Sequence, residues 1–248
     1  MAAVCATLRW FPKAANQASF RGMVEDNEIA APPAAKSPLP SATELAATVS
    51  ARLCHDFISP ASAIVSGLDL IEDPESQDMR EDAMNLITAS ARKLADHLAF
   101  ARVAFGASAA ADTFDTRALK TLAEGVFNHV RAELNWDIAL DSVNKPGARA
   151  LLNLAQIGAG AMPTGGVATM TAERDGDFLV VGVRADSPKV RLRAEVAEGL
   201  AGEPLGEGLA GHWVQAYYLY SLVKEAGGSL SFEASDEQMS AKARVPAA

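Results

Sequence analysis

The strongest constraint on the fold is a pair of long segments, residues 41–73 and 74–106, in which apolar side chains recur every three or four positions. This spacing is typical of amphipathic helices. Each segment has about 30 residues and would form a helix about 45 Å long. Because two such helices cannot cover their own apolar faces, we expect an antiparallel hairpin that completes a four-helix bundle with a second copy, as a homodimer.

The ends of both helices carry their own signals. Ser41 and Glu44 form the S-x-x-E pattern of a capping box at the start of the first helix. Asp73 can cap the second helix, with Pro74 in its first position. Gly106 is expected to end that helix, because glycine is common just after a helix C-terminus.

The rest of the chain divides into a tail and a second domain. Residues 1–40 hold a proline- and alanine-rich stretch without an apolar period, so we expect a disordered tail. After the small-residue joint 107–111, residues 112–248 alternate helical and strand patterns. The predicted fold class is therefore α+β: the helical hairpin of residues 41–106 followed by a C-terminal α/β sandwich.

Within the second domain the patterns predict individual elements. Helices are expected over 117–133, 149–161 and 212–226, and strands over 136–140, 167–172, 178–184, 229–233 and 240–245. Gly176 marks a hairpin turn between the second and third of these strands, and Gly227 ends the last helix.

The composition excludes several classes of function. A net charge of -9 disfavours a nucleic-acid partner, which would require a basic surface. The two cysteines, Cys5 and Cys54, form neither a disulfide framework nor a metal motif, as suits a reducing cytoplasm. No apolar run reaches the roughly 18 residues that a membrane span needs. We therefore expect a cytoplasmic protein with no nucleic-acid and no membrane partner.

The main chemical signal is His55, which begins the run His-Asp-Phe-Ile-Ser-Pro inside the first helix. Pro60 lacks an N–H group and is expected to kink the helix about one turn after the histidine. Arg52, Ser59 and Ser62 share the face of the histidine at helical spacing. That face is small and polar, so the imidazole is expected to be exposed.

Imidazole is a good nucleophile near neutral pH, because its reference pKa is about 6.5. The neighbouring Asp56 can orient the ring or accept a proton. His55 and Asp56 are therefore the candidate catalytic residues. The three other histidines lack such neighbours and are expected to be structural: His97, His129 and His212.

The run from His55 to Pro60 resembles the H-box of histidine-kinase dimerisation domains. The longer stretch 51–70, together with 91–94, 100–107 and 211–216, is similar to the ChpT histidine phosphotransferases of alphaproteobacteria. The resemblance covers about residues 45–248. It implies a dimer with a kinase-like bundle, a degenerate ATPase-like second domain, and His55 as the phosphoacceptor. It also implies the partners: the receiver domain of a CckA-like hybrid kinase, and CtrA-like and CpdR-like response regulators.

The same resemblance implies that the ATP site of a kinase is lost. Asn153 matches the first asparagine of the N-box, but the metal-binding position falls on Ile157, which cannot coordinate a cation. Both glycines of the D-x-G-x-G loop are missing after Asp186, and residues 206–211 resemble a second glycine-rich region. We therefore expect no cofactor on this chain, with Mg²⁺ supplied by the partner receiver domain.

A receiver must dock on the polar flank of the hairpin and bring its aspartate to His55. The residues expected to contact it are Arg52, Ser59, Ser62 and Val65. Ile64 is more typical of a dimer core, whereas Val65 lies one position further round the helix. Sequence reasoning therefore predicts that Val65→Asp slows transfer and leaves the dimer intact.

Two other functions compete with the phosphotransferase. An active sensor kinase with an unusual ATP site would bind ATP and phosphorylate itself. A non-catalytic module that occupies a receiver or a kinase and inhibits it would never carry phosphate on His55.

Overall fold

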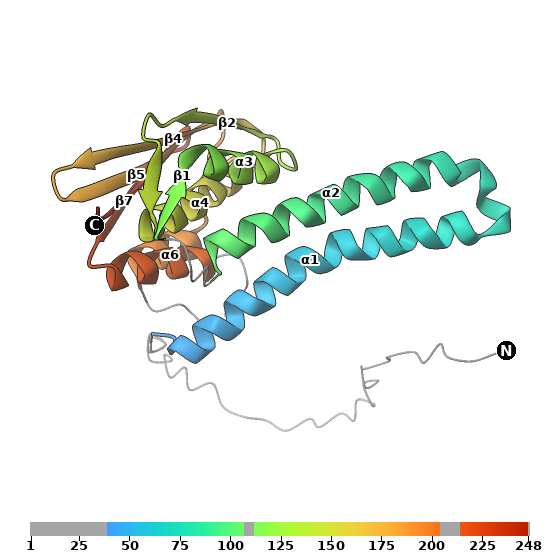
Figure 1. Ribbon diagram of the computed structural model, residues 1–248, viewed down its shortest axis with the longest axis horizontal. Helices are drawn as coiled ribbons and strands as arrows, with labels where there is room; N and C mark the ends of the chain where they lie inside the picture. Colours follow the sequence, from blue (N-terminus) through green and yellow to red (C-terminus); the bar gives the residue numbers. More distant parts are fainter. Residues whose placement is uncertain (1–38, 107–111, 204–213, 248) are drawn as a thin grey trace, which may run out of the picture. The chain divides into compact units, whose positions relative to one another are not determined.

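The computed structural model describes residues 39–106, 112–203 and 214–247 (Figure 1). The expected tail, the joint 107–111 and the glycine-rich region 206–211 lie outside these residues, apart from the last positions of the tail. The elements are, in order, α1 (Ala42–Glu72), η1 (Pro74–Met79), α2 (Arg80–Ala104), β1 (Thr113–Asp115), α3 (Thr116–Phe127), β2 (Ala132–Asp137), β3 (Ser142–Asn144), α4 (Lys145–Gly160), β4 (Gly166–Asp175), β5 (Phe178–Asp186), α5 (Ala194–Ala201), α6 (Val214–Glu225), β6 (Ser229–Ala234) and β7 (Gln238–Pro246).

The two long helices form where their end signals predict them. The Ser41 side chain accepts a hydrogen bond from the Glu44 backbone, and the Glu44 carboxylate accepts one from the Ser41 backbone at 2.8 Å, which completes the capping box. Helix α1 runs 31 residues and continues through the buried Pro60 without a break. Asp73 caps the next element as expected, but the turn after Pro74 is a 3₁₀ helix before α2 begins.

Helices α1 and α2 fold back on each other as a hairpin (Figure 1). Close approach depends on Gly67, where an added Cβ would lie 2.6 Å from Cγ1 of Ile87. Ala83 and Phe100 of α2 are buried. The outer surface of the hairpin carries large apolar side chains that stay exposed: Ile58, Val65 and Leu68 on α1, Met79 at the end of η1, and Met84, Leu86 and Leu98 on α2.

The second domain is built on a five-stranded sheet in the order β2-β4-β5-β7-β6. Strands β2 and β4 pair in parallel, and the other neighbours pair antiparallel. Along β4, Ala168 and Met170 are buried while Thr171 and Glu173 are exposed, so one face of the strand meets the core. Helix α4 packs on β4, β5 and β7 and brings Leu151 and Leu154 into that core. The α+β fold class predicted from the sequence is confirmed.

The boundaries of the helices and strands differ from the sequence prediction mainly between α3 and β2. The helix expected over 117–133 ends at Phe127, and Ala132–Asp137 instead form β2. The strand expected over 136–140 thus begins four residues earlier, because pairing with β4, which buries Ala132, outweighs the helical pattern of residues 132 and 133. The short elements β1, β3 and α5 were not predicted.

No helix in the described ranges combines the length and the apolar character needed to cross a bilayer.

Candidate functional site

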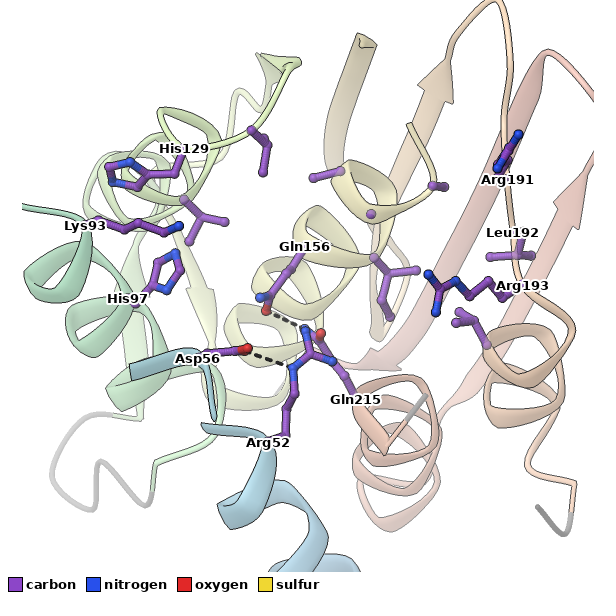
Figure 2. Close-up of a pocket in the computed structure, with 17 residues that line it drawn as sticks. Arg52, Asp56, Lys93, His97, His129, Gln156, Arg191, Leu192, Arg193 and Gln215 are labelled. Carbon is purple, nitrogen blue, oxygen red and sulfur yellow. Dashed lines mark hydrogen bonds and ion pairs between the residues drawn. The ribbon is translucent and has the colours of Figure 1, made fainter. Parts of the chain in front are cut away.

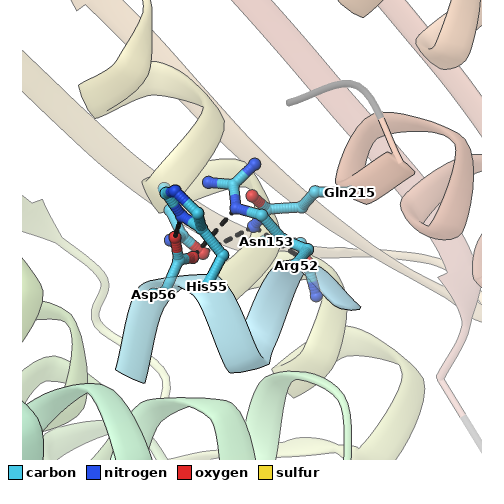
Figure 3. A network of polar contacts seen from close by, with 6 residues as sticks. Arg52, His55, Asp56, Asn153 and Gln215 are labelled. Atoms are coloured by element: carbon cyan, nitrogen blue, oxygen red, sulfur yellow. Dashed lines mark hydrogen bonds and ion pairs between the residues drawn. The ribbon is translucent and has the colours of Figure 1, made fainter. Parts of the chain in front are cut away.

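His55 lies in the middle of α1 with its side chain 83% exposed, which confirms the expected accessibility of the imidazole. Its Nδ1 lies 3.5 Å from Oδ1 of Asp56 (Figure 3). This contact is at the outer limit of a hydrogen bond, and contacts of this kind often tighten only when the reacting partner is bound. The other ring nitrogen, Nε2, lies on the far side of the ring from Nδ1 and does not face Asp56.

Asp56 makes its shorter contact with Arg52. Nε of Arg52 donates to Oδ2 of Asp56 at 2.9 Å, from one turn earlier on α1. The two side chains are 18% and 25% exposed, so the ion pair is largely shielded. The two carboxylate oxygens of Asp56 are thereby divided between Arg52 and His55. Arg52 was expected to contact a receiver, but in the structure its guanidinium faces Asp56.

The other predicted docking residues lie on the outside of α1. Ser59 and Ser62 are exposed on the same face as His55. Val65 is 56% exposed, whereas Ile64 is half-buried, so the choice of Val65 as the accessible residue of the two agrees with the structure. Val65 also stands between Ile58 and Leu68 at helical spacing, so it belongs to an apolar stripe that extends along α1.

A buried polar cluster of the second domain lies behind the Arg52–Asp56 pair (Figure 3). Asn153 on α4 is fully buried, and its Nδ2 donates to the carbonyl oxygens of Ala104 at 3.2 Å and Arg149 at 2.8 Å. Gln215 on α6 donates to Oδ1 of Asn153 at 3.1 Å and to Oε1 of Gln156 at 2.7 Å. The N-box-like asparagine therefore ties α4 to the end of α2.

Gln156 and Gln215 were not predicted from the sequence. The one available signal was that Gln215 lies in the segment 211–216, which carries part of the family resemblance. Gln156 lies in the N-box-like segment, one residue before Ile157. Nothing in its spacing distinguishes it from an ordinary helix residue.

A cavity of about 380 Å³ opens between the hairpin and the second domain (Figure 2). Its charged lining comes from both domains and comprises Arg52, Asp56, Lys93, Arg191 and Arg193. Asp56 is the only acidic residue among those that line the cavity in the described part of the chain. The space beside the Arg52–Asp56 pair is therefore positively charged, although the whole chain is acidic.

Two histidines line the same cavity and join the hairpin to the second domain. Nε2 of His129 lies 2.9 Å from Oδ2 of Asp96 on α2, and the rings of His97 and His129 meet edge to face at 5.9 Å. Burial lowers the pKa of His97, and the nearby Lys93 acts in the same direction. Both histidines thus take part in packing between elements.

The residues that resemble a kinase ATP site have other partners. Ile157 is 8% exposed in the helix that carries Asn153. Asp186 accepts hydrogen bonds from Gln238 at 2.7 Å and from Arg184 at 2.8 Å, and the bond from Gln238 is the largest cause of its lowered pKa. Within the described ranges, no three His, Cys, Asp or Glu side chains converge as a metal site.

The comparisons with known proteins agree with this arrangement. A family model described as "Histidine phosphotransferase C-terminal domain" matches residues 116–238. The protein phosphotransferase ChpT of Brucella abortus (strain 2308) is 36% identical over 201 residues, which cover 80% of this chain and 94% of the relative. A solved structure of a bacterial phosphotransferase has 33% identity and a TM-score of 0.75, and the match covers 84% of this chain and all of that one. The chain therefore belongs to the ChpT family of histidine phosphotransferases.

Proposed function

We propose that this phosphorelay protein carries the phosphoryl group on Nε2 of His55. The observation that supports this assignment most directly is the 83% exposure of His55 beside a carboxylate that faces its Nδ1. A nucleophile in a relay must be reached by two successive partners, so exposure is required. The carboxylate favours the ring form in which Nδ1 carries the proton and Nε2 has a lone pair.

In the proposed transfer step, one bond to phosphorus forms as another breaks. The Nε2 lone pair attacks the phosphorus of a receiver aspartyl phosphate, the P–N bond forms, and the P–O bond to the aspartate breaks. The aspartate leaves as a carboxylate with the electron pair of that bond. The ring keeps its Nδ1 proton and becomes positively charged, and Asp56 stabilises that charge from 3.5 Å or less. Transfer to the next receiver is the same step in reverse, with a different aspartate.

The partners in this proposal are receiver domains. The donor is the receiver of a CckA-like hybrid kinase, and the acceptors are CtrA-like and CpdR-like response regulators. Mg²⁺ bound by the receiver would neutralise charge on the transferring phosphoryl group. This chain contributes the nucleophile and its positioning, and it needs no ATP because the phosphoryl group arrives already activated.

We further propose that the chain acts as a homodimer through the outer face of the hairpin. Ile58 and Leu68 on α1, and Met84 and Leu98 on α2, are each between 46% and 62% exposed. Large apolar residues repeated along both helices mark a surface that another molecule covers. A second hairpin applied to this surface would complete the four-helix bundle.

The test is a relay reaction with purified components. A receiver domain phosphorylated with acetyl phosphate is mixed with the chain, and then a second, unphosphorylated receiver is added. We expect phosphate to appear on the chain, in the acid-labile and base-stable form of phosphohistidine, and then on the second receiver. His55→Ala should fold as the wild type, since exposed positions change stability little, and should take no phosphate. Phosphate on His55→Ala at the wild-type level would reject the assignment, and a wild-type chain that binds receivers without taking phosphate would instead support the inhibitor function.

A further inference from the structure

The contacts of Arg52 separate it from the docking residues that share its helix. Its Nε binds Oδ2 of Asp56 at 2.9 Å, while Oδ1 of the same carboxylate faces Nδ1 of His55. A carboxylate can rotate about its Cβ–Cγ bond unless one oxygen is fixed. The Arg52 contact fixes Oδ2 and thereby directs Oδ1 towards the imidazole.

Arg52 lies beside polar side chains of the second domain. Arg52, Asp56, Gln156 and Gln215 together line a cavity of only about 20 Å³, so their side chains converge closely. Figures 2 and 3 show the guanidinium of Arg52 beside Gln215, with Asp56 on its other side. The glutamine pair is itself held by the 2.7 Å bond between Gln215 and Gln156 and by the 3.1 Å bond to Asn153.

Asn153 gives the cluster a rigid base. It is fully buried, and its two donor bonds go to backbone carbonyls, one on α4 and one at the end of α2. Backbone oxygens of helices are fixed points, so Asn153 cannot shift without moving a helix. The hydrogen-bonded cluster of the second domain therefore reaches the small cavity that Arg52 and Asp56 also line, next to His55 on α1.

We propose that Arg52, supported by Gln156 and Gln215, is a positioning residue that sets the orientation of Asp56 and hence the tautomer of His55. This inference rests on the proposed phosphoacceptor role of His55. It gives the second domain a direct part in the chemistry, because side chains of α6 and of α4, which carries the N-box-like segment, would help to orient the nucleophile. Arg52 acts through Asp56 and does not touch the phosphoryl group.

Other charged groups near Asp56 do not replace Arg52 in this role. From α2, Lys93 and His97 line the larger cavity beside Asp56, and His129 follows α3. Arg191 and Arg193 line it from the chain segment that leads into α5. Arg52 alone among these described residues has a hydrogen bond to Asp56. Lys93→Gln therefore removes a positive charge from the same cavity without breaking the Arg52–Asp56 contact, and it serves as the matched control.

The first measurement is the tautomer of His55 in the full chain. Two-bond ¹H–¹⁵N correlation spectra, recorded above the pH range where imidazole is protonated, distinguish protonation at Nδ1 from protonation at Nε2. We expect the Nδ1-protonated form to predominate in the wild type and in Lys93→Gln. Arg52→Gln and Gln215→Leu should both increase the Nε2-protonated form, whereas Arg52→Lys should restore part of the wild-type population.

The second measurement is the rate of transfer from a receiver phosphorylated with acetyl phosphate. Arg52→Gln should lower kcat by about tenfold and change KM little. The expected loss is smaller than the roughly 10²-fold or more that an oriented acid–base group contributes, because Asp56 itself remains. The double variant Arg52→Gln/Gln215→Leu should be no slower than Arg52→Gln, because the two residues act through one contact.

The outcomes separate this inference from the proposed function. A wild-type chain that takes no phosphate would reject the function of His55, and the tautomer spectra would still decide the role of Arg52. Wild-type spectra in Arg52→Gln would overturn the inference. A raised KM with unchanged kcat would also overturn it and return Arg52 to the receiver-docking surface. If Gln215→Leu did not fold, Arg52→Gln and Arg52→Lys, which change a partly exposed side chain, would decide alone.

Discussion

Arg52 and Asp56 form an ion pair of 2.9 Å, one turn apart on α1 and directly beside the exposed His55. The sequence places both residues on one helix but does not show that they bind each other. The pair divides the oxygens of Asp56 between a fixed cation and the imidazole. We propose that this relationship orients the histidine for phosphoryl transfer.

The first prediction concerns Asp56 itself. Asp56→Asn should slow phosphoryl transfer by about 10²-fold or more, because an amide cannot stabilise the positive ring that forms as Nε2 attacks. Rates are compared in single-turnover reactions with a phosphorylated receiver. Asp69→Asn is the control, since Asp69 is an exposed carboxylate further along α1 and should not affect the rate. Equal rates for Asp56→Asn and the wild type would exclude a catalytic role for Asp56.

The second prediction is that the chain alone neither binds nor hydrolyses ATP. Ile157 occupies the metal-binding position of the N-box-like segment, and Asp186 is bonded to Arg184 and Gln238. Isothermal titration with Mg²⁺-ATP should give no heat of binding at micromolar concentrations. Micromolar affinity, or autophosphorylation with labelled ATP, would restore the sensor-kinase alternative.

The third prediction distinguishes the two roles open to Val65. The sequence predicted that Val65 contacts a receiver. In the structure, Val65 lies between Ile58 and Leu68 in the exposed apolar stripe, which favours a place in the proposed dimer interface. On the structural argument, Val65→Asp should produce a monomer, because a carboxylate buried between apolar side chains has no partner. Light scattering after size exclusion gives the mass. Ser66→Asp, an exposed position on the polar face, should stay dimeric.

A dimeric Val65→Asp protein with slowed transfer would instead support the docking role. A dimer with wild-type rates would exclude both roles. The measured mass and the transfer rate must therefore be obtained on the same preparation.

The fourth prediction is a dependence of stability on pH that comes from His97. Its pKa is lowered mainly by burial, so the unfolded chain binds this proton more readily than the folded chain. The free energy of unfolding should therefore be highest above about pH 6.5, the reference value, and should fall as the pH drops through the lowered pKa. Urea titrations across this range should give a smaller loss in His97→Asn than in the wild type. The same loss in both proteins would contradict the prediction.

The fifth prediction concerns the residues before α1. Deleting residues 1–40 should leave the relay activity unchanged, because the cut keeps Ser41 and its capping box. Ser41→Ala in the same shortened chain should cost about 1 kcal/mol of stability through the lost cap. Thermal unfolding and transfer rates measure the two effects. A large loss of transfer in the shortened chain would show that the tail takes part in the relay.

The sequence by itself determined the local features of this protein. Ser41, Asp73 and Gly227 act at helix ends as their types predict, because capping and positive φ depend on a few neighbouring residues. The α+β class followed from the apolar spacing within each segment. The exposure of His55 followed from the polar residues on its face of a single helix. These inferences succeed because the physical cause lies within one or two helical turns.

The tertiary structure decided the rest. Strand β2 begins at Ala132 because β4 offers a parallel partner, although the local pattern favoured helix up to residue 133 and a strand only from residue 136. Gln156 and Gln215 are separated from Arg52 by more than a hundred positions, and nothing in their local sequence marks them. They meet beside Arg52 only because α4 and α6 pack near the hairpin, which sequence spacing cannot show. The proposed nucleophile was thus visible in the sequence, whereas the contacts proposed to orient it depend on long-range packing.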